Sequence, residues 1–382
     1  MSETISPIQA RVGQPTLYDV SRLSGASIAT VSRVFSGKAR VSDKTRQRVM
    51  DAARELAYEP SHAARALVGR RTHTLGAIFP EIASGFYADV LAGIDEVAAG
   101  AGFDVLASFV GARRSRPELV KRLIRQGRAD ALIVVNLDDS GDLTPDAIQE
   151  LPIILVDHAI NGSTLPVVGM DNVGGAEAMI EHLFEQGHRR IAILTGPDGN
   201  FDSAQRLMGC RQAVKRLGLN LDEQLIWRGA FTWSSGSRAA REFLESRQPL
   251  PDAIFCLNDA MAIGVLSELQ RAGLTAPEDV ALAGYDNVEA AGHLSLTSVA
   301  CPMRLMGQLA ARWAVDLITK NERPEGHRLQ VRLVVRNSSA GKDDGRFGAA
   351  APAPKGAALR SSPPPNIRMI GDDDGDGAAA SK

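Results

Sequence analysis

Cysteine is scarce in this 382-residue sequence: Cys210, Cys256 and Cys301 lie far apart and are odd in number. Their spacing matches neither the C-x-x-C pairs of zinc and redox sites nor a disulfide framework. The seven histidines do not cluster at a metal-binding spacing either. We therefore expect three buried thiols that pack as small apolar side chains, and neither a metal nor any other cofactor.

Long apolar runs are also missing from the chain. No stretch approaches the ~18 to 20 residues that a transmembrane helix needs, and residues 1–15 lack the cationic start, apolar core and cleavage site of a signal peptide. These absences predict a cytoplasmic protein without a membrane partner. Residues 1–15 themselves are expected to form a flexible N-terminus.

The motifs that carry common enzyme chemistry are absent as well. The sequence contains no G-x-S-x-G elbow, no G-x-x-x-x-G-K-[ST] phosphate loop, no H-E-x-x-H pair and no G-x-G-x-x-G after a first strand. We therefore do not predict an enzyme.

The length of the chain exceeds the usual size of one domain and predicts two or three folded units. From Gly341 onward Gly, Ala, Pro and Asp predominate, so residues 341–382 are predicted to form a disordered tail. This tail has no leucine heptads, and nothing in it predicts a coiled-coil tetramer.

Residues 16–36 have the pattern of two short amphipathic helices joined by a tight turn at Gly25. Ser27 is the expected N-cap of the second helix, and a third helix is expected from about Asp43 to Ala57. The apolar residues expected to face inward are Leu17, Val20, Leu23, Val31, Val34, Val49, Ala53 and Leu56. Three such helices are too small for an enzyme core and are typical of a helix-turn-helix that presents one helix to the major groove of DNA.

The charge of this region agrees with a DNA partner. Between Arg11 and Arg71, twelve Lys or Arg stand against five Asp or Glu, a local charge of +7 in a chain of formal net charge -2. Clustered cations supply sequence-independent DNA affinity through counterion release. A basic stretch alone is equally often a solvated surface, but together with the helix-turn-helix pattern it predicts double-stranded DNA as a partner.

Between about Thr74 and Arg336, short apolar runs alternate with helix-length amphipathic segments, which predicts parallel sheets covered by helices. The expected strands are 75–79, 105–109, 131–135, 153–156, 191–194, 253–257 and 280–284. The expected helices are 86–99, 117–126, 174–186, 203–217, 234–246, 260–272 and 303–318. This length favours two lobes, with a ligand beyond the carboxyl ends of the strands.

Polar and aromatic side chains follow many of the expected strands. They are Phe86, Tyr87, Asp157, Asp171, Asn172, Asp202, Arg206, Phe231, Trp233, Asn258, Asp259, Asp286 and Asn287. Carboxylates, amides, a guanidinium and aromatic faces suit a polyhydroxylated ligand. Asp and Asn after a strand are also ordinary N-caps of the next helix, so only the convergence of several of them favours a binding site.

From about Thr16 to Arg336 the sequence resembles the lactose/galactose repressor (LacI/GalR) family of bacterial transcription regulators. The resemblance is carried, in order, by TLYDV, GASIATVSRVFSG, VSDKTRQRVMDAARELAYEPS, ARALVGRRT, LGAIFPEI, VVGMDN, HLFEQGHRRIAILTGP, SAQRLMGCRQAV, IFCLNDAMAIGVL and VALAGYDN. It implies an all-α headpiece at 16–60, a hinge helix and linker at 61–73, and an α/β effector-binding and dimerisation domain at 74–340. The last would resemble two-lobed periplasmic sugar-binding proteins, with an N-lobe of about 74–170 and 298–326 and a C-lobe of about 171–297 and 327–340.

For DNA, the resemblance places base reading on Ile28, Ala29 and Arg33. The phosphate contacts implied by it are Thr16, Leu17, Ser27, Thr30 and Ser32. Its minor-groove wedge falls on Leu67 with help from Ala64, within a hinge helix at 61–68. Ser36 stands where the family commonly has Asn, which makes a phosphate contact from that position shorter.

For the effector, the resemblance implies contacts from Phe86, Asp157, Asp171, Arg206, Phe231, Asn258 and Asp286. Two departures change the pocket edge: Ser84 and Gly85 replace a common Asn, and Cys301 replaces a frequent Gln. The identity of the ligand therefore does not carry over.

These observations predict a homodimeric, sequence-specific repressor of carbohydrate-utilisation genes in the bacterial cytoplasm, associated with the nucleoid. It would bind a roughly palindromic operator and respond to a small sugar-like effector. The alternatives are a sugar-transport protein, an enzyme of sugar metabolism, an activator, and a regulator with a purine-like corepressor. An export signal or turnover of sugars would favour the first two.

Overall fold

The computed structural model describes residues 15–36, 41–58, 71–80, 85–110, 116–136, 151–157, 165–322 and 324–341. Most of the expected N-terminus, hinge and tail lies outside these ranges, and so do Ala64 and Leu67. The predictions for those segments stay predictions.

The N-terminal part forms three helices. They are α1 (Leu17–Ser24), α2 (Ile28–Ser36) and α3 (Asp43–Glu55). Gly25 ends α1 with φ 63°, a left-handed conformation that glycine adopts without strain from a Cβ atom. The Oγ of Ser27 accepts a hydrogen bond from the backbone N–H of Thr30 at 3.2 Å, which confirms the predicted N-cap of α2.

The core of this three-helix unit differs from expectation at one position. Val20 is fully buried, but Leu23 is 45% exposed, and Ser24 is buried instead. Successive helical residues are about 100° apart, so Leu17 and Ser24 lie on nearly the same line while Leu23 falls on the other side of Val20. The inward-facing stripe therefore continues through a small polar residue.

The first lobe is built on a six-stranded sheet in the order β11-β5-β4-β3-β1-β2, in which all pairs are parallel. Its strands are β1 (Thr74–Phe79), β2 (Asp104–Phe109), β3 (Ala131–Val135), β4 (Ile153–Val156), β5 (Val167–Met170) and β11 (His327–Leu329). Its helices are α5 (Gly85–Gly100), α6 (Arg116–Arg125) and α13 (Met303–Lys320). Strands β1, β3 and β4 are buried at every residue, which explains their uninterrupted apolar sequences.

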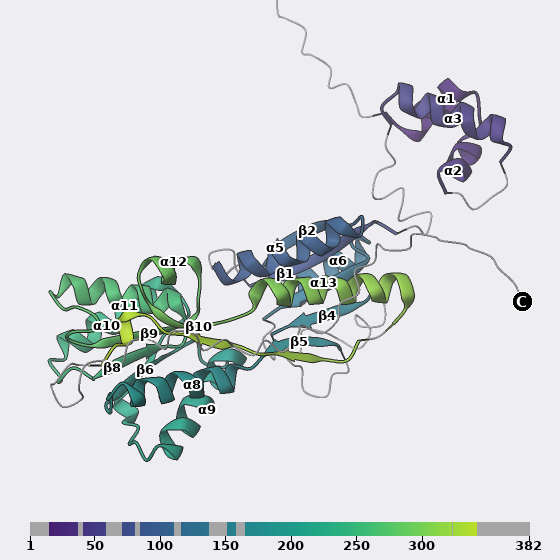
Figure 1. Ribbon diagram of the computed structural model, residues 1–382. Coiled ribbons are helices and arrows are strands. Elements are labelled where there is room, and N and C mark those ends of the chain that lie inside the picture. Colours follow the sequence, from purple (N-terminus) through teal and green to yellow (C-terminus); the bar gives the residue numbers. More distant parts are fainter. Residues whose placement is uncertain are drawn as a thin grey trace, which may run out of the picture. The chain divides into compact units, whose positions relative to one another are not determined.

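The second lobe repeats this plan with the order β12-β10-β9-β8-β6-β7, and only the edge pair of β10 and β12 is antiparallel. Its strands are β6 (Ile191–Thr195), β7 (Ile226–Arg228), β8 (Ala253–Cys256), β9 (Ala281–Asp286), β10 (Thr297–Ala300) and β12 (Arg332–Val334). Its helices are α8 (Asn172–Glu185), α9 (Phe201–Arg216), η1 (Glu223–Leu225), α10 (Trp233–Glu245), α11 (Asp259–Arg271), α12 (Glu289–His293) and η2 (Asn337–Ser339). Figure 1 shows α10 and α11 on one side of the sheet and α8 and α9 on the other.

Both sheets reverse their winding direction at a corresponding place. In the first lobe this point lies between β1 and β3, and in the second it lies between β6 and β8. In open α/β sheets, ligands bind beyond the carboxyl ends of the strands at such a point. The predicted two-lobed α/β architecture is therefore confirmed, and it directs attention to the residues that follow these strands.

Two of the expected passages between the lobes occur later in the chain. Strand β10 pairs with β9 in the second sheet, so the chain leaves that sheet after Ala300 instead of near residue 298. Strand β11 pairs with β5 in the first sheet, so the last passage follows Leu329 instead of Gly326. The expected boundaries missed these two strands because each is only three or four residues long.

Pairs of helices pack against each other at glycine. A Cβ atom on Gly93 of α5 would overlap the carbonyl oxygen of Arg304 in α13, and one on Gly307 of α13 would overlap the carbonyl oxygen of Val90. Gly236 and Gly264 play the same part between α10 and α11. The backbones of these helices approach so closely that no side chain fits between them.

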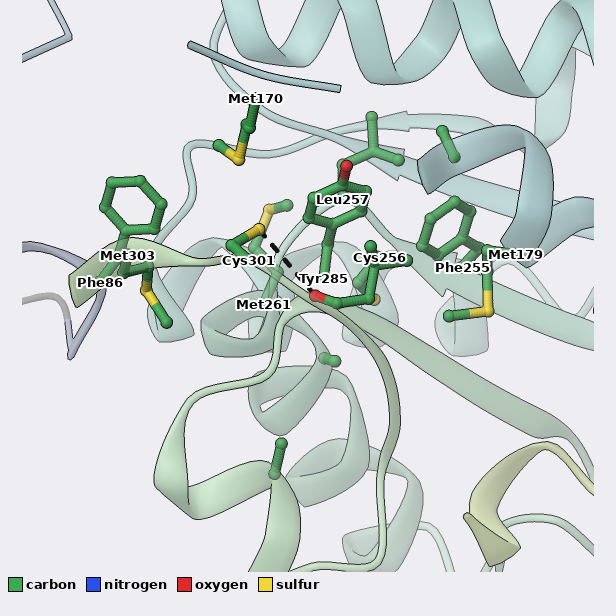
Figure 2. Close-up of a cluster of buried hydrophobic side chains, with 14 of the residues drawn as sticks. Phe86, Met170, Met179, Phe255, Cys256, Leu257, Met261, Tyr285, Cys301 and Met303 are labelled. Atoms are coloured by element: carbon green, nitrogen blue, oxygen red, sulfur yellow. Dashed lines mark hydrogen bonds between the residues drawn. The ribbon is translucent and has the colours of Figure 1, made fainter. Parts of the chain in front are cut away.

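The core of the second lobe is rich in sulfur and aromatic side chains (Figure 2). Tyr285, Phe255 and Cys256 are fully buried there. All three cysteines of the chain are buried and unpaired, as predicted. They fill space in the core and the pocket wall, because burial raises the pKa of Cys210, Cys256 and Cys301 and keeps each thiol protonated.

The start of β1 is held by the carboxylate of Asp130. Its Oδ1 accepts hydrogen bonds from the backbone N–H and the hydroxyl of Thr72 at 2.7 and 2.9 Å, and its Oδ2 accepts from the backbone N–H of His73 at 2.8 Å. The guanidinium of Arg71 also donates to the carbonyl oxygen of Ile318 at the end of α13. The chain therefore enters the first lobe at a fixed point.

Candidate functional site

The outer face of α2 has the composition and exposure predicted for it. Ile28 is 41% exposed, and Ala29 and Arg33 are also exposed, whereas Val31 and Val34 are buried against the other two helices. Thr30 and Ser32 are half-buried beside them, and Thr16 and Ser27 are exposed. Helix α2 thus presents two apolar side chains and one guanidinium, flanked by hydroxyl groups.

A second candidate site lies where the carboxyl ends of the two sheets meet. A cavity of about 40 Å³ is enclosed there, which is room for about three water molecules. The residues that line it are Phe86, Tyr87, Asn136, Asp202, Arg206, Phe231, Asn258 and Asp286. The first three come from the first lobe and the rest from the second, so the cavity is a nearly closed cleft between lobes.

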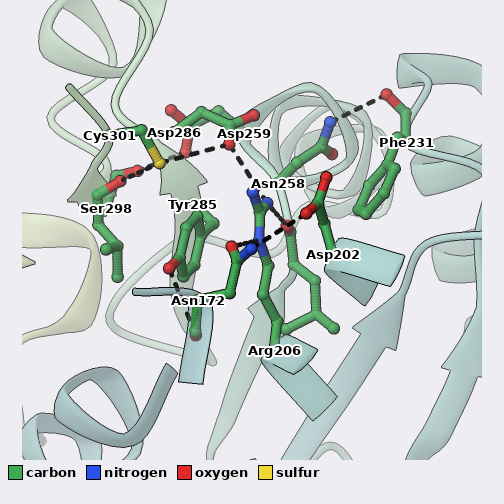
Figure 3. Close-up of polar contacts among 12 residues, drawn as sticks. Asn172, Asp202, Arg206, Phe231, Asn258, Asp259, Tyr285, Asp286, Ser298 and Cys301 are labelled. Atoms are coloured by element: carbon green, nitrogen blue, oxygen red, sulfur yellow. Dashed lines mark hydrogen bonds and ion pairs between the residues drawn. The ribbon is translucent and has the colours of Figure 1, made fainter. Parts of the chain in front are cut away.

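The guanidinium of Arg206 lies at the centre of the cleft, with Asn172, Asp202 and Asp286 around it (Figure 3). Its Nε donates to Oδ1 of Asn172 at 2.8 Å, and its Nη1 donates to the carbonyl oxygen of Leu257 at 2.6 Å and to Oδ1 of Asp286 at 3.2 Å. The guanidinium carbon lies 3.9 Å from the centre of the Tyr285 ring. Arg206 is only 3% exposed, so these contacts fix it as a rigid, charged floor.

The aromatic wall is set by the backbone of the second lobe. Phe231 has φ 58°, a strained conformation for a residue with a Cβ atom. Its carbonyl oxygen accepts a hydrogen bond from Nδ2 of Asn258 at 3.0 Å, and a Cβ atom on Gly196 would overlap its ring. Gly196 and Asn258 therefore hold the Phe231 ring at the cleft, which is how a loop keeps a stacking surface in place.

Carboxyl groups dominate the rest of the cleft. Burial raises the pKa of Asp157 well above its usual range, and the neighbouring Asp202 raises it further. Burial also raises the pKa of Asp286 to about 6, although Arg206 acts in the opposite direction. Below the cleft, burial raises the pKa of Asp259 to about 8. The closed cleft consequently holds protons that these groups would release in water.

Asn136 joins the two halves of the cleft. In the amide orientation that satisfies its neighbours, its oxygen accepts from the hydroxyl of Tyr87 at 3.1 Å and its nitrogen donates to Oδ2 of Asp202 at 3.2 Å. The same nitrogen lies 3.1 Å from the carbonyl oxygen of Asp157. Asn136 did not appear among the sequence candidates, although it directly follows β3 and the same strand-end rule selects it.

The effector-site residues expected from the resemblance fall into three groups. Phe86, Arg206, Phe231, Asn258 and Asp286 line the cavity. Asp157 lies buried beside them, within reach of the charges of Asp202 and Arg206. Asp171 is not among the lining residues, and its Oδ1 accepts from the backbone N–H of Gly174 at 3.1 Å. Asp171 thus has the N-cap role that the sequence offered as the alternative.

The pKa of Asp286 gives a pH-dependent expectation for Asp286→Asn. Because the folded carboxyl titrates at about 6 instead of 3.8, the folded state binds this proton more tightly than the unfolded state between these values. The contribution of Asp286 to stability is therefore full below pH 3.8 and is lost as the pH rises through about 6. Urea unfolding across this range should show the native free energy of unfolding falling relative to that of the variant. Parallel curves would contradict the shift.

Two further features were searched for in the described part of the chain. No helix there is long and apolar enough to cross a membrane. No group of three or more His, Cys, Asp or Glu side chains there is arranged to hold a metal ion.

Comparison with known proteins gives matches to both parts. The profile of bacterial regulatory proteins of the lacI family matches residues 16–61, and the periplasmic binding protein-like domain matches residues 180–339. The HTH-type transcriptional regulator CelR of Thermobifida fusca is 37% identical over 341 residues, which cover 85% of this chain and 98% of that protein. The HTH-type transcriptional repressor CytR of Escherichia coli is 33% identical over 328 residues, 85% of this chain and 96% of CytR.

Solved structures agree with these relatives. A complex of transcriptional regulator CelR with cellobiose superposes with a TM-score of 0.65 and 34% identity, covering 85% of this chain and 99% of that one. The lac repressor dimer bound to operator and the anti-inducer ONPF superposes with a TM-score of 0.71 and 28% identity, covering 86% and 100%. The match extends over both the helical unit and the two lobes.

Proposed function

The chain belongs to the lacI family of bacterial regulatory proteins, and from this membership we propose that it is a homodimeric repressor of carbohydrate-utilisation genes controlled by a small sugar-like effector. Its relatives are DNA-binding transcriptional regulators, and we assign it no enzymatic role. It would act in the cytoplasm, at the nucleoid, because its operator lies there. The single observation that supports this function best is the exposed face of α2 on a chain that also carries an inter-lobe cleft.

We propose that α2 enters the major groove. Arg33 would donate two hydrogen bonds to O6 and N7 of a guanine, while Ile28 and Ala29 would make apolar contacts such as one to a thymine methyl. The groups proposed to hold phosphates are Thr16, Leu17 through its backbone, Ser27, Thr30 and Ser32. Outside the described residues, Leu67 and Ala64 would enter the minor groove from the hinge helix.

We propose that the effector binds in the cleft between the lobes. Arg206, Asp286 and Asn258 would form hydrogen bonds with its polar groups, and the rings of Phe86 and Phe231 would cover its apolar face. The cavity is smaller than a sugar, so the lobes must separate to admit the ligand and close again around it. Ligand binding and lobe movement are thereby linked.

We propose that a second copy of the chain covers the edge of the first lobe. An apolar groove of about 510 Å³ lies there between α5 and β2, and β2 is the edge strand of its sheet. Its lining residues are Tyr87, Ala88, Leu91, Ala92, Asp95, Val105, Ala107 and Phe109. A twofold dimer at this groove would present two α2 helices and so require an inverted-repeat operator.

The test of this function is selection of DNA by the full-length protein from a random oligonucleotide library at moderate salt. We expect enrichment of one inverted repeat with two similar half-sites. Recovery of no inverted repeat would overturn the proposal.

The Arg33→Ala variant should lose specificity. We expect its affinity for the selected operator to fall by about 1 to 3 kcal/mol, with a much smaller loss on unrelated DNA, because a base contact carries sequence information and a phosphate contact does not. Binding titrations on both DNAs at one salt concentration measure this. Arg22→Ala is the matched control, since Arg22 is an exposed arginine on α1 that pairs with Asp19 at 3.0 Å. Equal losses on both DNAs for Arg33→Ala would mean that it contacts only phosphate.

A further inference from the structure

The effector cleft has a surplus of negative charge. Among the described residues that line it, Arg206 is the sole cation, whereas Asp202 and Asp286 are acids and Asp157 lies buried beside them. Three carboxyl groups thus share one guanidinium. Buried charges need opposite charges or donors close by, because water no longer solvates them.

Arg206 is already occupied by other groups. Its printed hydrogen bonds go to Asn172, Leu257 and Asp286, and it stacks on Tyr285. These contacts satisfy the guanidinium within the second lobe. Arg206 therefore balances Asp286, and it leaves the charge of Asp157 and Asp202 without a cation of their own.

Asp157 and Asp202 approach each other from different lobes. Asp157 follows β4, and Asp202 lies in the first turn of α9. Their side chains share a hydrogen bond, which two carboxylates form only when a proton lies between them. The other oxygen of Asp157, Oδ2, is buried and has no hydrogen-bond partner. Asp157 also has φ 57°, so a strained backbone keeps this unsatisfied carboxyl in the cleft.

We propose that the effector carries a protonated amino group that binds between Asp157 and Asp202, on a polyhydroxylated body of the size of an amino sugar. This inference rests on the proposed effector function. An ammonium group has three N–H donors and no acceptor, which matches carboxylate oxygens that only accept. It replaces the shared proton, supplies a donor for Oδ2 of Asp157 and neutralises the surplus charge. A neutral sugar supplies donors without charge, and an acidic sugar adds a further anion.

The experiment compares matched sugars on the full-length protein. For each of the gluco, galacto and manno configurations, the 2-amino sugar, the neutral hexose and the hexuronate are tested by thermal unfolding, and those that stabilise are titrated by calorimetry. We expect one amino sugar to bind at least about tenfold more tightly than its neutral and acidic counterparts, as a charge-assisted hydrogen bond provides. Its affinity should rise as the pH is raised through about 6, because protons compete for the same carboxylates.

Variants identify the group that selects the amine. In Asp202→Asn, which keeps the shape of the side chain, we expect the preference for the amino sugar over the neutral hexose to fall by about tenfold or more. Asp198→Asn is the matched control, because Asp198 is an exposed aspartate that pairs with Arg228 nearby in the same lobe. Asp157→Asn provides a second test should Asp202→Asn fail to fold.

Three results would overturn the inference: a neutral or acidic sugar that binds as tightly as its amino counterpart, a preference unchanged in both variants, or no stabilisation by any amino sugar. None of these affects the operator selection described above. A protein that enriches an inverted repeat but ignores amines would retain its proposed function and lose only this ligand class.

Discussion

The Arg206→Ala variant should unfold with a free energy about 3 to 5 kcal/mol below that of the native protein. The guanidinium is 3% exposed and bonds three acceptors, namely Asn172, the carbonyl oxygen of Leu257, and Asp286. Removing it leaves Asp286 as a buried carboxylate without its cation and opens a cavity beside Tyr285. Breaking one partner of a buried pair costs far more than the net value of the pair, because the remaining charge stays desolvated.

Urea unfolding followed by circular dichroism measures this loss. Arg211→Ala is the matched control on the same helix, since Arg211 lies at the surface with its side chain 50% exposed and pairs only with Glu223. We expect the control to unfold at nearly the native urea concentration, because exposed ion pairs contribute little. The Arg206 variant should also lose its response to the effector. Equal midpoints for the two variants would contradict the burial that we describe.

Alanine at Gly93 should destabilise the first lobe by at least about 2 kcal/mol. Helix propensity alone predicts the reverse, since alanine is favoured over glycine in a helix interior by about 1 kcal/mol. The new Cβ atom, however, would overlap the carbonyl oxygen of Arg304, and backbone cannot move aside as a flexible side chain can. Helices α5 and α13 would have to separate along their contact.

Gly100→Ala on the same helix is the control for this prediction. No atom lies within 4 Å of a Cβ built at Gly100, so we expect no loss of stability there and a small gain from helix propensity. The two variants should therefore shift the midpoint of chemical unfolding in opposite directions. A Gly93→Ala protein as stable as the native one would show that the helices have room to adjust.

The long elements of the fold could be predicted from sequence, and several short ones could not. Strand β3 was expected at its observed bounds, because its five apolar residues are buried on both faces. Strands β7 and β12 are three residues long and only partly buried, so their sequences carry no apolar run. Such strands exist because a neighbouring strand pairs with them, and pairing between distant segments leaves no local pattern.

The candidate site was predictable to a similar degree. The rule that ligands lie beyond strand ends selected Arg206 and Asp286, and the family resemblance reduced the larger set of candidates. Asp171 shows the limit of that rule, because capping a helix and lining a cleft call for the same residue type after a strand. The meeting of Asp157 and Asp202 could not be predicted, since they belong to different sheets and only the closed arrangement of the lobes brings them together.

The clamp formed by Asp130 has a mechanical consequence for signalling. Strand β1 begins at this clamp and ends at the loop that leads to Phe86 in the cleft, and its six residues rise by about 3.3 Å each. Effector and linker are thus attached to opposite tips of a strut about 20 Å long that the surrounding strands keep from bending. A tilt of the lobe that draws Phe86 toward a ligand must swing the other tip, like the far arm of a lever, and carry the tether of the DNA-binding unit with it.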